Sequence, residues 1–236
     1  MIINIVFLIV CLFILYILIP WGFKILIRDK FLLKIKKSGC VCLTFDDGPN
    51  PKTTPNILKL LEEKNIKATF FLLGKNAEKY PNIVKDIING GHEIGEHSYK
   101  HTHAWITGPI FTAVDLIKGE RVLKRMKFPH KINLIRPPYG KFNFVTLLYV
   151  WLRKKRVAFW NIDPEDFANS SSQSIAEYVL HRLNSGSVVL FHDARKNTSR
   201  PADLTVEAIK LILEKSSDVG FHFMTISKAL NRSKRT

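Results

Sequence analysis

The chain opens on one long apolar run. Residues 1–23 carry no charged side chain, and a helix of that length spans roughly 35 Å at about 1.5 Å per residue. This exceeds the ~30 Å hydrocarbon core of a bilayer. No basic residue precedes the run and no small-residue cleavage site follows it, which argues against a removable signal peptide. Residues 1–23 are therefore predicted to form one transmembrane anchor rather than a buried core helix.

A basic cluster opposed only by Asp29 follows the apolar run, and it consists of Lys24, Arg28, Lys30, Lys34, Lys36 and Lys37. Cations beside a membrane attract anionic lipid head groups, so residues 24–38 are predicted to form a basic juxtamembrane linker in contact with lipid. By the positive-inside rule the same charges place the rest of the chain in the cytoplasm. A short basic tail, residues 231–236, ends the sequence.

Beyond residue 38 the hydrophobic pattern alternates between two periods. Short apolar runs predict strands at 40–45, 67–73, 92–95, 134–135, 156–162, 187–191 and 222–226. Apolar residues at helical spacing predict helices at 54–64, 77–89, 110–126, 144–152, 174–183 and 203–215. Alternating strands and helices indicate a mainly parallel sheet with helices outside. We expect one α/β domain over residues 39–230, folded as a distorted (β/α)7-type barrel.

The composition narrows the classes of protein further. The 236 residues are 46% hydrophobic and 24% charged, which excludes global disorder. Three cysteines are too few for a disulfide-stapled fold. The formal net charge is +16, but no nucleic-acid-binding motif accompanies it. We therefore expect a basic surface near an anionic membrane or glycan, and no nucleic-acid partner.

Polar residues gather where the predicted strands end. Asp46 and Asp47 follow the first strand, and His97 and His101 are four residues apart, a spacing that puts both on one face of a helix. Two imidazoles and one carboxylate form a three-ligand zinc site with an open position. In such a pair of acids, one can bind the metal while its neighbour transfers a proton. Arg136, residues 163–166 and His192 follow other strands, so a metal-hydrolase site is predicted at this end of the barrel.

Five segments resemble the motifs of the NodB-like polysaccharide deacetylases, carbohydrate esterase family 4, in the order of that family: residues 44–49 (TFDDGP), 97–101 (HSYKH), 136–140 (RPPYG), 160–167 (WNIDPEDF) and 190–193 (LFHD). The resemblance covers about residues 40–230. It implies a distorted barrel and metal-dependent hydrolysis of an acetyl group from a sugar. It also implies that Asp47, His97 and His101 hold one divalent metal ion, and zinc is the ion expected.

The resemblance assigns further roles residue by residue. Asp46 would be the general base, held by Arg136, and His192 the general acid, paired with Asp166. Asp163 stays open as an alternative carboxylate partner for His192. The substrate-binding residues would be Tyr139, whose backbone N–H faces the oxyanion, together with Pro138, Phe167 and Leu190 around the acetyl group.

Two positions depart from the family pattern. Phe167 stands where tryptophan is usual, and Glu96 where asparagine often precedes the second motif. Neither is a proposed ligand or proton carrier, so activity is expected. The other polar and aromatic candidates are expected to have structural roles: His92, His103, His130, His181, His222, Asp193, Trp105 and Trp151.

The leading hypothesis is a membrane-anchored deacetylase of N-acetylated sugars in a peptidoglycan- or chitin-like glycan. Family precedent favours the outer face of the cell membrane, whereas the flanking charge favours the inner face. Two alternatives remain, namely a deacetylase of a lipid-linked sugar precursor at the inner face and a catalytically silent glycan-binding homologue.

Overall fold

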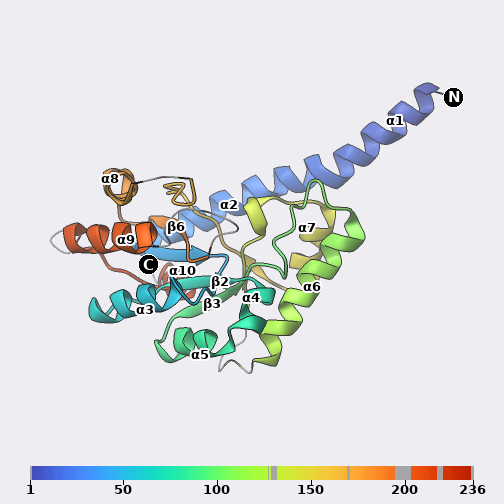
Figure 1. Cartoon of the computed structure of the whole chain (residues 1–236). Coiled ribbons are helices and arrows are strands. Elements are labelled where there is room, and N and C mark those ends of the chain that lie inside the picture. Colours follow the sequence, from blue (N-terminus) through green and yellow to red (C-terminus); the bar gives the residue numbers. More distant parts are fainter. Residues whose placement is uncertain are drawn as a thin grey trace.

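Six parallel strands form a curled sheet with helices on both sides (Figure 1). The computed structural model describes residues 2–126, 128, 132–168, 171–194, 203–216 and 220–234. The strand order is β5-β4-β3-β2-β1-β6, and the strands are β1 (Cys42–Asp46), β2 (Thr69–Leu72), β3 (Glu93–Glu96), β4 (Leu134–Ile135), β5 (Arg156–Val157) and β6 (Val188–His192). The predicted α/β class and curled parallel sheet are confirmed.

The sheet is a half-barrel, and the predicted seventh strand does not form in the described chain. Residues 222–226 contribute one isolated bridge, between Phe223 and Val41. From Thr44 onward, β1 is already paired with β2 on one side and β6 on the other, so no edge is free for another strand there. The predicted strand 156–162 is also short. It pairs with β4 at its start, and its last residue, Ile162, bridges to Val189 of β6.

The helices that cover the sheet are α3 (Thr54–Glu63), α4 (Gly74–Lys79), α5 (Pro81–Asn89), α6 (Pro109–Arg125), α7 (Phe144–Leu152), α8 (Ser172–Arg182), α9 (Asp203–Ser216) and α10 (Ile226–Arg232). The helix predicted at 77–89 is divided in two at Pro81. A proline ring disfavours helical backbone at the preceding residue, and Tyr80 is accordingly outside the helical region, with φ −127° and ψ 59°. Helix α10 was not predicted.

Two apolar clusters fill the two faces of the sheet. Residues at alternate positions of a strand face opposite sides, so Phe45 packs among the helices α3, α5, α8 and α9, whereas Cys42 faces the concave side. Phe45 stacks between Phe70 and Phe191 of the neighbouring strands, at ring-centroid distances of 4.8 and 5.9 Å. The carboxyl ends of the central strands are thereby fixed relative to one another.

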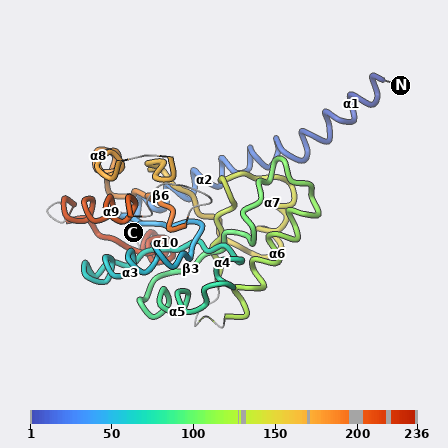
Figure 2. Tube along the Cα trace, in the orientation of Figure 1, coloured from blue at the N-terminus to red at the C-terminus, as the bar shows by residue number. Residues whose placement is uncertain are grey.

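The N-terminal segment is one continuous helix, Ile2–Ser38, long and apolar enough to cross a membrane. It comprises α1 (Ile2–Phe13), one π-helical turn η1 (Ile14–Leu18) and α2 (Ile19–Ser38). Figure 2 shows α1 projecting away from the domain, whereas α2 lies along it. Phe31 and Ile35 of α2 are buried in the concave cluster. Residues 24–38 thus belong to a helix that packs against the domain through these side chains, while the expectation of a basic linker in contact with lipid stays a prediction.

Gly95→Ala is expected to lower the free energy of unfolding by about 1–3 kcal/mol, the usual cost of overpacking a core. A Cβ at position 95 would collide with the Phe71 ring, and that ring stacks under the Arg136 guanidinium at 4.3 Å. Denaturant unfolding in detergent measures the change. Gly22→Ala is the control, since no heavy atom lies within 4 Å of its Cβ position. Equal unfolding midpoints for both variants would contradict the prediction.

Candidate metal and catalytic site

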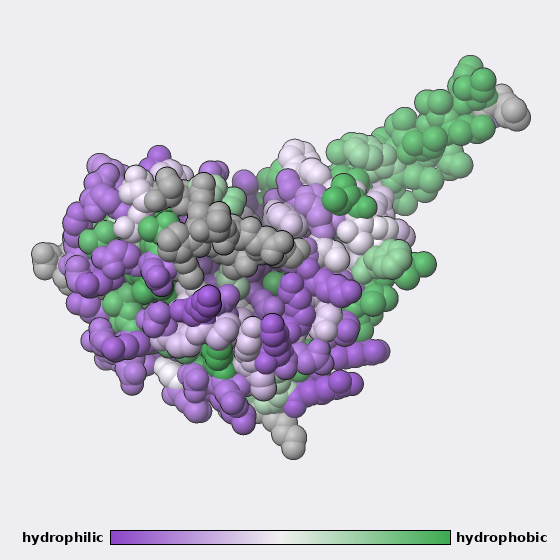
Figure 3. Space-filling model, viewed as in Figure 1, coloured by the Kyte–Doolittle hydropathy of each residue, from purple (hydrophilic) through white to green (hydrophobic). Residues whose placement is uncertain are grey.

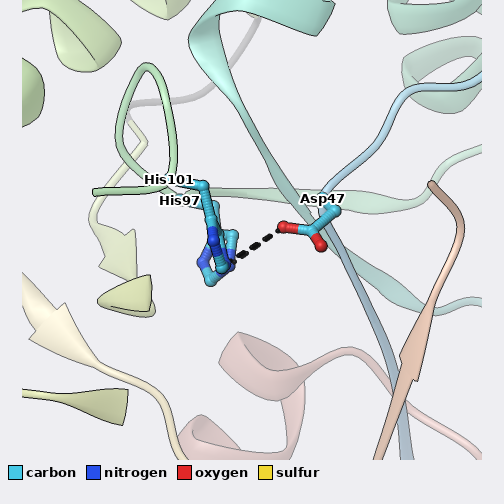
Figure 4. Close-up of side chains that lie close together, drawn as sticks. All are labelled: Asp47, His97 and His101. Carbon is cyan, nitrogen blue, oxygen red and sulfur yellow. Dashed lines mark ion pairs between the residues drawn. The ribbon is translucent and has the colours of Figure 1, made fainter. Parts of the chain in front are cut away.

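Asp47, His97 and His101 come together at the carboxyl ends of β1 and β3 (Figure 4). One ligand atom of each lies within 4.8 Å of the others. The Asp47 Oδ1 atom is 3.5 Å from His97 Nε2 and 3.3 Å from His101 Nε2. Two imidazole nitrogens and a carboxylate oxygen at this spacing form a donor set that fits a divalent metal.

The two histidines do not lie on a helix, contrary to the expectation drawn from their spacing. His97 follows β3 directly, and the chain then reverses through Ser98 and His101, with φ 67° and 65°. The Asp115 carboxylate of α6 holds this loop by accepting bonds from the backbone N–H groups of Lys100 (2.7 Å) and Thr102 (3.3 Å). The reversal leaves the two rings 5.0 Å apart between centroids.

The His97 ring is oriented for metal binding. Its Nδ1 lies 2.6 Å from the Arg136 carbonyl oxygen. A carbonyl can only accept, so Nδ1 carries the proton and Nε2 is left as the ligand atom. Burial lowers the pKa of His97 to about 3, although the hydrogen bond to the Arg136 carbonyl acts against that fall. The ring is therefore neutral, which is the form that binds metals.

Asp46 is held beside the metal candidates by a buried arginine. Arg136 Nη1 donates to Asp46 Oδ1 at 2.7 Å and to Thr44 Oγ1 at 2.9 Å, and Nη2 donates to the Phe159 carbonyl at 3.2 Å. Arg136 is completely buried. Burial raises the pKa of Asp46, while the Arg136 charge acts against that rise. The second Asp46 oxygen lies 3.7 Å from His97 Nε2, which places this carboxylate next to the position that a bound metal would occupy.

His192 at the end of β6 is paired with Asp166. Its Nδ1 lies 2.7 Å from Asp166 Oδ1, and its backbone N–H donates to Asp166 Oδ2 at 3.0 Å. Thr205 of α9 donates to the same Oδ2 at 2.9 Å. Burial by itself would lower the pKa of His192, but the hydrogen bond and charge of Asp166 raise it to about 9. Asp163 instead accepts from the Glu165 backbone N–H at 3.0 Å, so it is not the partner of His192.

A cavity of about 610 Å³ joins these groups. Tyr139, Phe167 and Leu190 line it, whereas Pro138 is not among its lining residues and lies buried. Tyr139 adopts φ 56° in the short 3₁₀ turn η2 (Pro138–Gly140), and its ring lies 4.4 Å from that of His101. The Phe167 ring meets the His192 ring edge-on at 5.4 Å. Three of the four predicted substrate-binding residues are thus exposed to the cavity.

Two comparisons decide the family. A model of the polysaccharide deacetylase family matches residues 34–151. A peptidoglycan-N-acetylglucosamine deacetylase of Bacillus cereus is 37% identical over 194 residues, which cover 82% of this chain and 69% of that protein. The chain belongs to the polysaccharide deacetylase family. It is accordingly a hydrolase that acts on carbon–nitrogen bonds.

Solved structures of polysaccharide deacetylases share the fold. The peptidoglycan deacetylase PdaC of Bacillus subtilis superposes with a TM-score of 0.74 and 29% identity, covering 84% of this chain and 92% of that one. The Bc1960 peptidoglycan N-acetylglucosamine deacetylase superposes with a TM-score of 0.73 and 36% identity, covering 81% and 87%.

Several cavity residues of this polysaccharide deacetylase lie outside the five motifs: Lys75, Asn76, Lys79, Tyr80 and Lys141. Asn76 donates to the Asp47 carbonyl at 2.7 Å and so supports the metal candidates. The first four lie on α4 or at its end, directly after β2. Because parallel strands end at one edge of the sheet, that position was a usable signal.

The remaining candidates have structural contacts. His92 Nδ1 accepts from the Ala68 backbone N–H at 3.1 Å, and Trp105 Nε1 donates to the Phe142 carbonyl at 2.8 Å. Asp193 is buried beside Gly48 and accepts from Thr54 at 2.6 Å. Trp151 is exposed on α7, His181 and His222 are exposed, and His103 lies beside Tyr139. His130 lies outside the described residues.

Glu96 points away from the cavity. Its carboxylate accepts from the Tyr149 hydroxyl at 2.6 Å and pairs with Lys155 Nζ at 3.0 Å. Lys155 also pairs with Glu120 of α6 at 3.2 Å. The extra carboxylate beside His97 is thus neutralised within the fold, and it does not add negative charge to the metal candidates.

Proposed function

We propose that this protein is a membrane-anchored, zinc-dependent deacetylase that removes acetyl groups from N-acetylated sugars of a cell-wall or cell-surface glycan. One observation carries the proposal. The Asp47, His97 and His101 donor set lines one cavity together with Asp46 and His192, which Arg136 and Asp166 hold from behind. The proposed metal ligands are Asp47, His97 and His101. A divalent ion bound there would lower the pKa of its water to about 7 and polarise the acetyl carbonyl.

Asp46 is the proposed general base. Deacetylation needs a proton removed from water on attack, and a carboxylate within reach of the metal position can accept it. Arg136 fixes the Asp46 carboxylate through the 2.7 Å bond to Oδ1. The proton therefore goes to Oδ2, the oxygen that faces His97. In the same step the Tyr139 backbone N–H is proposed to donate to the developing oxyanion.

His192 is the proposed general acid. The C–N bond breaks only if the amine nitrogen receives a proton, because an amide anion is a poor leaving group. A pKa of about 9 keeps His192 protonated at neutral pH. Since Asp166 occupies Nδ1, the proton is delivered from Nε2 to the sugar nitrogen, and acetate and a free amine result. Phe167 and Leu190, which line the cavity, are proposed to shape the acetyl pocket.

The substrate is proposed to be peptidoglycan or a chitin-like glycan outside the cell. The relatives named above are peptidoglycan deacetylases, and the helix Ile2–Ser38 would hold the enzyme at the membrane. The second candidate is a lipid-linked sugar precursor at the inner face, which the basic residues of α2 favour. Protease treatment of intact cells separates the two, since only an outward-facing domain is digested.

The proposed activity is tested by acetate release from the full chain in detergent. Peptidoglycan fragments, chitooligosaccharides and a lipid-linked N-acetylated sugar form the panel, each with added zinc and with chelator. We expect zinc-dependent acetate release from at least one substrate. Stoichiometric zinc binding with no acetate from any substrate would instead identify a silent glycan-binding homologue.

Asp166→Asn is expected to move the alkaline limb of the pH–rate profile to lower pH. A general acid must be protonated, so His192 supports activity below its pKa of about 9 and loses it as the pH rises through that value. Without the carboxylate, burial lowers the pKa of His192, and the rate falls by about tenfold or more at neutral pH. Thr205→Val, which leaves the carboxylate in place, is the control. An unchanged alkaline limb in Asp166→Asn would refute the pairing as the source of the raised pKa.

A further inference from the structure

Part of the apolar run, residues 1–23, contacts the catalytic domain. The Tyr16 hydroxyl, inside the run, accepts a hydrogen bond from Asn143 Nδ2 at 2.8 Å and lies 3.5 Å from the Thr107 carbonyl oxygen. The π-helical turn η1, which contains Tyr16, packs against α7 of the domain. The uncharged run continues for seven residues beyond Tyr16, to Phe23, so a membrane span built from this run includes Tyr16.

Exposed apolar side chains lie on or next to the segments that contact Tyr16 and η1. We call this set the collar, and it consists of Ile106, Ile110, Phe111, Val114, Phe144 and Leu148. It lies on the loop before α6 and on the first two turns of α6 and α7. Asn143 ties these segments together, because its Nδ2 also donates to the Ala104 carbonyl at 2.7 Å and to Thr112 Oγ1 at 3.2 Å.

The collar is strongly exposed for apolar side chains. Ile106 is 84% exposed, Ile110 74% and Phe111 71%. Figure 3 shows the projecting helix as an apolar surface, with further apolar side chains beside its base on the side of α6. Soluble monomers rarely expose contiguous apolar patches of this kind without an interaction partner.

We infer that the catalytic domain is seated in the lipid bilayer through the collar. The inference rests on the proposed anchor. If the uncharged run lies in the membrane while Tyr16 keeps its contacts with Asn143 and Thr107, the collar residues next to them, Phe144 and Ile106, lie at membrane depth as well. Interfacial apolar faces typically enter about 5–10 Å into the boundary between head groups and acyl chains. The bilayer is therefore the partner that the collar fits.

In this arrangement, basic side chains lie at the depth of the lipid head groups. Lys24 follows Tyr16 by eight residues, about 12 Å along the helix, and its Nζ lies beside Gly140 and Trp160. Lys24 also lies near the charged side chains of Lys141 and Arg28. Anionic phosphates would neutralise this cluster. Lys141 and Trp160 line the catalytic cavity, so the cavity opens at head-group depth, within reach of a sugar carried on a membrane lipid.

Fluorescence quenching in liposomes tests the seating. Full-length protein with Cys11→Ser and Phe111→Cys carries one environment-sensitive label at position 111, because Cys40 and Cys42 are buried. The liposomes contain phosphatidylcholine and phosphatidylglycerol with brominated acyl chains. The wild-type chain labelled at Cys11 reports the helix, and Cys11→Ser with Tyr178→Cys reports exposed α8, distant from α1 in Figure 1.

We expect brominated lipid to quench the labels at positions 11 and 111 but not the label at 178. Quenching at 11 with none at 111 would overturn the collar and leave the anchor intact. No quenching at 11 would overturn the anchor, and the collar with it. Acetate release from a soluble chitooligosaccharide is measured on the same samples, so a failure of the catalytic proposal is seen separately.

A charged collar supplies an independent test. Ile110→Asp with Phe111→Asp is expected to abolish quenching of a label at Ile106→Cys in the Cys11→Ser background, because carboxylates resist transfer into lipid. Acetate release from soluble substrate should stay at the level of the parent. Retained quenching at position 106 would overturn the seating.

Discussion

Asp46→Asn is expected to lower acetate release by about 10²–10⁴-fold, the usual contribution of a general base, while zinc binding is retained. The amide keeps the volume of the carboxylate and can still accept from Arg136 Nη1, which donates to Oδ1 at 2.7 Å in the wild type. It cannot take a proton from water. The three proposed ligands Asp47, His97 and His101 are untouched. Acetate assays and metal analysis of the same dialysed samples measure the two properties.

Asp163→Asn is the matched control for Asp46. Asp163 also lines the cavity, but its carboxylate accepts from the Glu165 backbone within its own loop. We expect this variant to keep activity within a few-fold of wild type. Equal acetate release by Asp46→Asn and wild type would refute the base assignment. Loss of zinc from Asp46→Asn would instead show that Asp46 itself holds the metal.

The position of the candidate site could be predicted from the sequence because the site residues come directly after predicted strands. Asp46 and Asp47 come directly after the apolar run of β1, and His192 ends β6, which pairs with β1 through Asp46↔His192. Parallel strands end at a common edge, so residues at their carboxyl ends converge even when they are far apart in the chain. The resemblance already paired His192 with Asp166, but excluding Asp163 needed the structure, because both acids lie within the same short segment.

The loop geometry could not be read from the spacing of His97 and His101. Four residues fit one helical turn, yet the chain instead turns through positive φ at Ser98 and His101. That shape depends on Asp115 of α6 and on the close approach of Gly119 to the Ser98 backbone. Both contacts are tertiary and lie more than ten residues away in the sequence.

The docking of α2 was missed for a different reason. Its many basic residues favoured the prediction of a lipid-contacting segment. Phe31 and Ile35, however, have the i, i+4 spacing of a buried helical stripe. The half-barrel is open on its concave side, and α2 and α10 fill that space. The segment next to the apolar run therefore packs with the catalytic domain, which ties the position of the domain to that of the apolar helix.

His101→Ala is expected to abolish metal binding and to reduce acetate release to background. Loss of a residue that only hydrogen-bonds to a metal ligand typically lowers the metal affinity by about 10–100-fold. Loss of one of the three protein ligands themselves should lower the zinc affinity by more than that. The fold should be kept, because His101 lies on a loop outside both apolar clusters. Metal content after dialysis at graded free zinc measures the affinity, and thermal unfolding checks the fold.

His103→Ala is the control for the metal prediction. Its ring lies 4.9 Å from that of Tyr139, near His101, but His103 is not part of the donor set. This variant should bind zinc as wild type does. One zinc ion per chain with unchanged affinity in His101→Ala would show that the ion binds elsewhere, and the hydrolytic role of the Asp47, His97 and His101 set would then be wrong. Parallel loss of zinc and activity in His101→Ala alone would tie hydrolysis to that set.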